Sequence, residues 1–120
     1  MERLDVVVFV NDFDNVDKIE LLERSLLVNS YAYYVMNESI MSDFTYDKNA
    51  RQLVDFKKYH PEDFKHSRYY MIFHDFEGST GFDLIARINS NPELQRKIIR
   101  DVHLALCLLN NRNTNKKGDI

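Results

Sequence analysis

Two amphipathic segments separated by a short break are the feature that most constrains this fold. In residues 16–36 apolar side chains recur at spacings of three, four and seven, which predicts a long helix with Asp14 or Asn15 as its N-cap. A second helix is predicted from the caps Ser42-Asp43 to the step His60-Pro61. The predicted inner faces carry Ile19, Leu22, Leu26 and Tyr33 on the first helix and Tyr46, Ala50 and Leu53 on the second. Because so short a connection makes consecutive helices neighbours, we predict an antiparallel helix pair.

Two other runs have the composition of strands. Residues 5–10 are β-branched and aromatic, and residues 68–76 are rich in aromatic side chains and end at a turn with two glycines. We predict that they pair as a two-stranded ribbon. Residues 82–88 predict a short helix, and Asn91-Pro92-Glu93 supplies a cap, a proline at N1 and an acid for a C-terminal helix. The predicted fold class is therefore α+β.

The C-terminal helix should bury one stripe and then end. Its predicted stripe is Leu94, Ile98, Val102, Ala105 and Leu109. After Asn110 the apolar period stops, so we predict one domain over residues 1–110 and a polar, frayed C-terminal tail over residues 111–120.

Composition narrows the function classes. An apolar share of 44% is enough for a modest core in 120 residues, and a formal charge of −3 disfavours direct nucleic-acid binding by bulk electrostatics. The single cysteine, Cys107, forms no internal disulfide, and its apolar surroundings predict a buried thiol. With no apolar run long enough for a membrane span and no signal peptide, we expect a cytoplasmic location and no membrane partner.

The start of the second predicted helix places acidic and aromatic side chains on one face. Asp43, Tyr46 and Asp47 stand at i, i+3 and i+4 and form a single patch. The antiparallel arrangement brings Tyr33 toward Tyr46, and two phenol faces can hold a flat ring. Such faces suit an electron-poor cationic ring, since an aromatic face attracts a cation by about 0.5 to 2 kcal/mol. The carboxylates add attraction and accept charge-assisted hydrogen bonds. Ordinary helix packing and capping is the alternative explanation for any one of these residues.

Residues 31–47 read Tyr-Ala-Tyr-Tyr-Val-Met-Asn-Glu-Ser-Ile-Met-Ser-Asp-Phe-Thr-Tyr-Asp. This string resembles the N-terminal domain with which NAD-dependent DNA ligases bind nicotinamide mononucleotide (NMN), where a helix ends in Tyr-His or Tyr-Tyr and the next opens with Asp-x-x-Tyr-Asp. The likeness runs from about Leu21 to Asp63. It implies stacking by Tyr33 and Tyr46 and polar contacts from Asp43 and Asp47.

This sequence departs from the ligase pattern at two positions. Tyr34 falls where many ligases have histidine, and a phenol supplies one hydrogen bond to a phosphate but no cation. Ser39 replaces the usual proline in the connection. The lysine nucleophile of the Lys-x-Asp-Gly motif is also missing, and so is the length for a nucleotidyltransferase domain. We therefore expect no ligase activity from this chain by itself.

The glycine-flanked turn before residue 82 is a candidate second site. Gly78, Ser79, Thr80 and Gly81 can aim backbone N–H groups at an anion, although a tight capped turn is the explanation that we prefer. The surrounding string is similar to small, phage-encoded, standalone ligase-related proteins. The four histidines have no paired ligand spacing, so we predict no metal.

Three functional hypotheses follow. The first is a non-catalytic, phage-encoded module in the host cytoplasm that binds NMN or NAD, requires no cofactor, and acts as a sensor, a sequestering agent or a ligase accessory. The alternative is a protein-interaction or inhibitory, anti-defence module that binds a host or phage protein, with its pocket filled and an exposed patch at Tyr69, Tyr70 or Phe82. A third is a small enzyme cleaving a nicotinamide nucleotide through Glu77 or Asp47, although nothing in the sequence activates either group.

Overall fold

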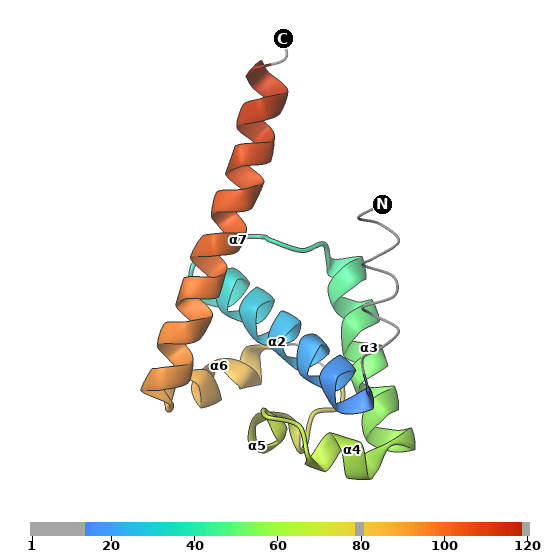
Figure 1. Ribbon diagram of the computed structural model, residues 1–120. Coiled ribbons are helices and arrows are strands. Elements are labelled where there is room, and N and C mark those ends of the chain that lie inside the picture. The colour runs from blue at the N-terminus through green and yellow to red at the C-terminus, as the bar shows by residue number, and fades with distance from the viewer. Residues whose placement is uncertain (1–13, 79–80, 119–120) are drawn as a thin grey trace.

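The computed structural model describes residues 14–78 and 81–118, and from residue 111 onward it describes the backbone alone. Its described residues form helices joined by short loops (Figure 1). With the labels of that figure, they are α2 (Asn15–Tyr34), α3 (Asp43–Tyr59), α4 (Pro61–Lys65), α5 (Tyr70–Phe73), α6 (Phe82–Asn89) and α7 (Pro92–Gly118).

Helix α2 is the centre of the molecule and packs against α3, α4, α6 and α7 (Figure 1). It begins where the Asp14 carboxylate accepts the Asp17 N–H at 2.8 Å, as the sequence predicts. Three or four residues separate most of its wholly buried side chains, which are Ile19, Glu23, Leu26, Leu27 and Ala32. A helix buried on so wide a face organises the elements around it.

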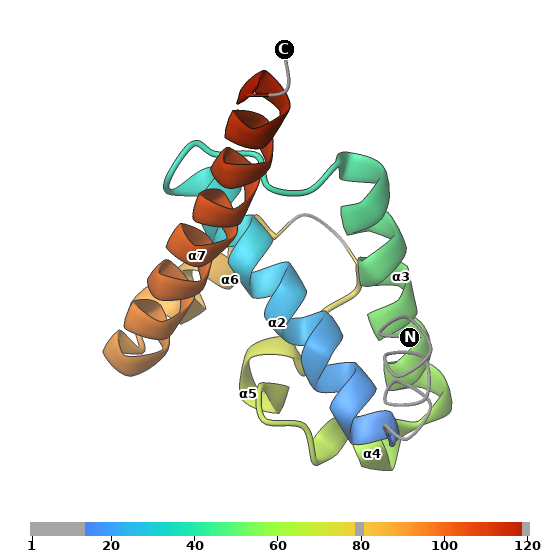
Figure 2. The same cartoon turned by 45° about the horizontal axis from the view of Figure 1, so that its top comes forward.

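The predicted antiparallel helix pair is confirmed. Helix α3 is capped by Ser42, whose hydroxyl accepts the Thr45 N–H at 3.2 Å. The Asn15 amide at the start of α2 donates to the Asp63 carboxylate at 3.0 Å and so joins that end to α4. From there α2 and α3 diverge toward the connection 35–42 (Figure 2). The pair is therefore closed at one end and open at the other.

The predicted strand at residues 68–76 is wrong, and with it the α+β class. These residues form turns and the short helix α5, and none of the described residues lies in a strand. The buried side chains are Tyr69, Phe73 and Phe76, spaced by four and three, which is a helical period. Composition favoured a strand, but the spacing of apolar positions decided the structure. The other predicted strand, residues 5–10, lies outside the described residues, so the described part is all-helical.

Helix α6 and the start of α7 are close to their predicted bounds. Helix α6 ends one residue later than expected, and the Asn91 side chain accepts the Leu94 N–H at 3.2 Å at the start of α7. The backbone of α7 stays helical to Gly118, so the frayed tail expected after Asn110 is not what the structure has, whereas the domain division at that point remains a prediction.

Only the first part of α7 packs closely on the body. Leu94, Ile98 and Val102 are buried, as predicted, whereas Ala105 and Leu109 are half-buried. Beyond them the helix points away from the other helices (Figure 1), and Cys107 is exposed rather than buried. Within the described residues, the helices are too short or too polar to span a bilayer.

A buried acid joins α2 to the segment after α4. Glu23 is wholly buried, and its carboxyl accepts the Ser67 hydroxyl at 3.0 Å with one oxygen and has no partner among the described residues for the other. Burial raises the pKa of Glu23 to about 8, which the Ser67 bond opposes and the charge of Glu20 reinforces. The side chain is therefore neutral in the folded protein at neutral pH.

Glu23 should make stability fall as pH rises. Unfolded, the carboxyl ionises at its ordinary pKa of 4.5, whereas the folded chain holds the proton to about pH 8. Its stabilisation is thus complete below the unfolded pKa and is lost between these two values. Glu23→Gln keeps an acceptor for Ser67 and should be more stable than the parent near pH 8 by a few kcal/mol, since each pKa unit is worth about 1.4 kcal/mol.

Urea unfolding at about pH 5 and about pH 8 measures this difference. Glu77→Gln, at an exposed glutamate, is the matched control and should follow the parent at both values. If Glu23→Gln also followed the parent, the buried carboxyl would have to be ionised in the folded state.

Candidate functional site

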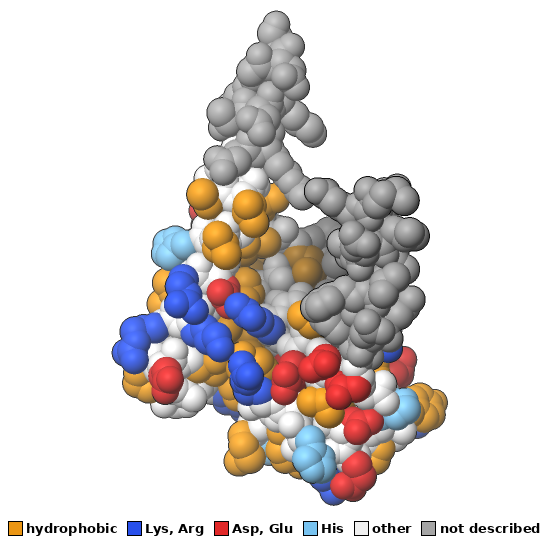
Figure 3. All heavy atoms as spheres, viewed as in Figure 1, with side chains coloured by type: hydrophobic (Ala, Val, Ile, Leu, Met, Phe, Trp, Pro, Cys, Tyr) orange, Lys and Arg blue, Asp and Glu red, His pale blue; other side chains and the backbone are white. Residues whose placement is uncertain are grey.

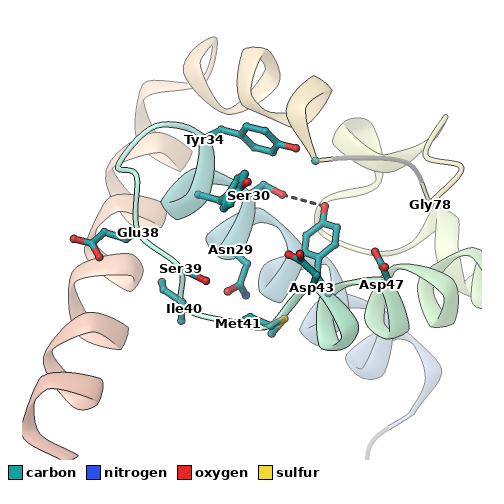
Figure 4. A pocket seen from close by; sticks show the side chains of 13 residues that line it. Asn29, Ser30, Tyr34, Glu38, Ser39, Ile40, Met41, Asp43, Asp47 and Gly78 are labelled. Atoms are coloured by element: carbon teal, nitrogen blue, oxygen red, sulfur yellow. Dashed lines mark hydrogen bonds between the residues drawn. The ribbon is translucent and has the colours of Figure 1, made fainter. Parts of the chain in front are cut away.

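A cavity of about 470 Å³ lies at the open end of the helix pair. It is bounded by the last turns of α2, the connection to α3, the first turns of α3 and the segment that enters α6 (Figure 4). Its lining residues are Asn29, Ser30, Tyr33, Tyr34, Glu38, Ser39, Ile40, Met41, Asp43, Tyr46, Asp47, Gly78 and Gly81.

The structure brings the predicted ligand-binding side chains to this one cavity. Tyr33 and Tyr34 come from the end of α2, and Asp43, Tyr46 and Asp47 from the start of α3. The first turn of α3 thus presents its predicted patch to the space that faces α2.

The candidate second anion site is not separate from the first. Gly78 and Gly81 line the same cavity, and Ser79 and Thr80 lie outside the described residues. The sequence therefore marked two stretches that meet at a single site.

Tyr46 is fixed at the base of the cavity. Its hydroxyl lies 3.1 Å from the Ser30 hydroxyl on α2, so this hydrogen bond ties the two helices together (dashed line in Figure 4). Burial raises the pKa of Tyr46, while the bond from Ser30 lowers it. The phenol is thus neutral and held in one position.

Tyr33 and Tyr34 form an exposed aromatic edge. Their ring centroids are 4.9 Å apart in a T-shaped pair, and Tyr34 makes a second T-shaped contact, 5.4 Å, with Phe82 at the start of α6. Tyr33 is 59% exposed, so most of its ring is free for a ligand. Among the described aromatic side chains its ring neighbour is Tyr34 rather than Tyr46, although Tyr33 and Tyr46 line the same cavity.

Acidic groups dominate the rim. Asp43 and Asp47 rise from neighbouring turns of α3 (Figure 4), and Glu38 from the connection joins them in the lining. Of the described residues that line the cavity, none is lysine, arginine or histidine. The site is therefore suited to hydroxyl and amide donors and to cations.

Sequence reasoning missed the polar side chains at the base. Ser30 precedes Tyr33 and Tyr34 by three and four residues. The helical period therefore places Ser30 on the same face as the two tyrosines, and this spacing is the signal that could have identified it. Asn29 donates to the Ser25 carbonyl oxygen at 2.7 Å, but its own buried Oδ1 has no partner among the described residues. An unpaired acceptor beside a cavity marks a place for a ligand donor. Glu38 had no periodic signal because it lies in the connection.

Side-chain bonds anchor the wall that carries Gly78. Arg87 of α6 forms two bonds of 2.7 Å with the Asp75 carboxylate and lowers the pKa of that group to about 2. Lys57 of α3 donates to the Phe76 carbonyl oxygen at 3.1 Å. Gly78 itself has a φ of +86°, which favours glycine at this turn.

Gly81 packs directly on the bond between Ser30 and Tyr46. A Cβ at this position would lie 2.7 Å from the Ser30 Cβ and 2.5 Å from the Tyr46 hydroxyl, and closer still to the Ser30 hydroxyl. Only glycine allows the segment to seal this side of the cavity.

We expect Gly81→Ala to lower the thermal midpoint, because overpacking of this kind typically costs about 1 to 3 kcal/mol. Ser30→Ala removes the nearest clashing atom, so the double variant should lose less than the sum of the two single losses. Thermal unfolding of the four proteins in this cycle measures both effects. Additive losses would mean that residue 81 does not pack on Ser30.

Comparison with known proteins agrees with this geometry. Residues 14–67 match the family model described as DNA ligase-like, N-terminal NAD+-binding domain. The DNA ligase of Thermotoga petrophila is 32% identical over 47 residues, and that of Buchnera aphidicola subsp. Acyrthosiphon pisum is 46% identical over 46 residues. These alignments cover 39% and 38% of this chain, and the chain spans only about 7% of each ligase. No solved structure matches.

The matched segment includes the five predicted ligand-binding residues, but Gly78 and Gly81 lie after its end. One wall of the cavity is thus made by chain that the family model does not cover. The resemblance found in the sequence is nevertheless confirmed: over residues 14–67 this chain is similar to the N-terminal NAD+-binding domain of DNA ligase.

Proposed function

We propose that this chain is a non-catalytic module that binds the nicotinamide half of NAD, or NMN, in the cavity between α2 and α3. One observation carries the proposal: five residues selected from sequence alone line a single open cavity. A volume of about 470 Å³ is within the usual range for small-molecule sites.

The side chains provide a partner for each part of such a ligand. The exposed face of Tyr33 offers a stacking surface for the cationic pyridinium ring. Asp43 and Asp47 accept hydrogen bonds from ribose hydroxyls, and the unpaired Asn29 Oδ1 suits a carboxamide N–H. These contacts bind and orient a ligand.

A non-catalytic role fits the composition of the chain. Ligase chemistry needs the lysine of a Lys-x-Asp-Gly motif, and this sequence has no such motif. The proposed role is that of a sensor, a sequestering agent or a ligase accessory, encoded by a phage and acting in the host cytoplasm.

The alternative of a protein-interaction module rests on exposed apolar side chains. Tyr69, one of the aromatics expected to mark it, is buried, but Phe82 is 63% exposed and Leu104 and Leu108 of α7 are 60% and 59% exposed. An open cavity argues against the form of this alternative in which the pocket is filled by its own side chains.

Thermal unfolding with NMN, NAD and AMP tests the proposal. Ligand at about a hundred times its dissociation constant adds about 2.7 kcal/mol, and NMN and NAD should raise the midpoint by several degrees while AMP does not. Tyr33→Ala and Asp47→Ala should abolish the shift. Both side chains are exposed, so neither variant should lose much intrinsic stability.

Phe44→Ala is the matched control. Phe44 is 73% exposed beside Asp43 but does not line the cavity, so this variant should keep the full shift. An unchanged midpoint at millimolar NMN and NAD would reject nucleotide binding and favour the protein-interaction alternative.

A further inference from the structure

The charges around the cavity constrain its ligand more than its shape does. Two carboxylates, of Asp43 and Asp47, border it, whereas the Glu38 side chain in the connection points away from it (Figure 4), and no cationic side chain is among the described lining residues. Arg51 is one turn beyond Asp47, but its Nε donates to the Asp47 carbonyl oxygen at 3.4 Å and it is not part of the lining. A cation entering this site meets attraction, and a phosphate meets repulsion.

Helix ends do not reverse this balance. The starts of α3 and α6 both lie at the cavity, and a helix N-terminus carries a partial positive charge of about half a unit. Each first turn, however, contains an acid, Asp43 in α3 and Asp83 in α6. These carboxylates offset the partial charges that a phosphate would otherwise use.

Tyr34 adds no charge at the edge nearest α6. Its ring is engaged by Tyr33 and Phe82, and its hydroxyl forms no hydrogen bond with the described residues. A neutral phenol donates one hydrogen bond but does not compensate the two charges of a phosphate monoester.

We propose that the cavity selects an unphosphorylated, cationic pyridinium riboside, and that a 5′-phosphate on the same ligand weakens its binding. This inference rests on the proposed function and specifies its ligand class. Nicotinamide riboside, which carries the pyridinium charge and no phosphate, is the probe that represents this class.

Calorimetric titration of the whole chain at low ionic strength compares nicotinamide riboside, NMN and NAD. The riboside should bind about threefold to tenfold more tightly than NMN, since each exposed charge pair changes affinity by a few-fold at most. Added salt should narrow the gap because it screens exposed charges. The reduced riboside, whose ring is neutral, should bind more weakly than the oxidised form.

Two substitutions test the electrostatic cause. Asp47→Asn should weaken riboside binding more than NMN binding, whereas Asp55→Asn, at an exposed acid on α3 outside the cavity, should change neither. Tyr34→His should improve NMN binding below about pH 6.5, where the imidazole is protonated, and Tyr34→Phe should not.

The outcomes separate the two proposals. Binding of none of the three ligands would overturn the proposed function itself. NMN binding as tight as the riboside, or tighter, would overturn this inference and leave the proposed function standing. A riboside preference that neither salt nor Asp47→Asn reduces would also overturn it, because exclusion of the phosphate would then be steric.

Discussion

The contact among Ser30, Tyr46 and Gly81 is the interaction on which the cavity depends. Ser30 belongs to α2, Tyr46 to α3 and Gly81 to the start of α6, so one hydrogen bond and one close approach bring three elements together. One turn farther along α3, the Asn49 amide donates to the Ser25 hydroxyl of α2 at 3.4 Å, so two hydrogen bonds hold the diverging helices together beside the cavity. The same contact makes Tyr46 a poor residue for testing ligand binding, because its removal changes the fold as well as the site. Tyr33 and Asp47, which are exposed, separate binding from stability.

Buried polar bonds continue this organisation toward the other end of α2. Glu23 and Ser67 bond in the interior, and the adjacent Glu20 carboxylate accepts the Arg68 N–H at 2.8 Å. Both bonds fall where the segment matched by the ligase family ends, at residue 67. The chain that follows returns to α2 at Gly81. The unmatched second half therefore packs on α2 at several points, which include the Arg68 N–H on Glu20, Gly81 on Ser30 and Asp101 on Arg24.

Much of the helix pair and of the lining of the candidate site was predictable because the signals are local. Caps at Asp14, Ser42 and Asn91 and the apolar periods predicted the bounds of α2 and α3 and the start of α7 to within a few residues. The i, i+3, i+4 spacing of Asp43, Tyr46 and Asp47 is enough to put them on one face, because the helical period alone sets the direction of each side chain.

The prediction of a strand at residues 68–76 was wrong because aromatic composition is a weaker signal than the spacing of buried positions. The buried side chains here are Tyr69, Phe73 and Phe76, which have the spacing of a helix. The position of Gly81 against Ser30 is a tertiary contact between residues far apart in the sequence, and no local pattern encodes it. The prediction of a buried Cys107 was wrong for a similar reason. An apolar run in a helix is buried only where other elements cover it, and α7 extends beyond the helices on which it packs.

Charge is also unevenly divided over the surface. Basic and acidic side chains gather in adjacent areas on the face seen in Figure 3, and the basic area includes α7. Of its side chains, Arg96 and Arg100 are exposed, yet none of the α7 residues lines the cavity. The exposed arginines of α7 thus lie outside the lining that carries the tyrosine edge, while the tyrosine edge is bordered by acids. Under the proposed function, this separation favours recognition of the pyridinium ring and ribose at the cavity, since the basic side chains that would neutralise a phosphate lie elsewhere.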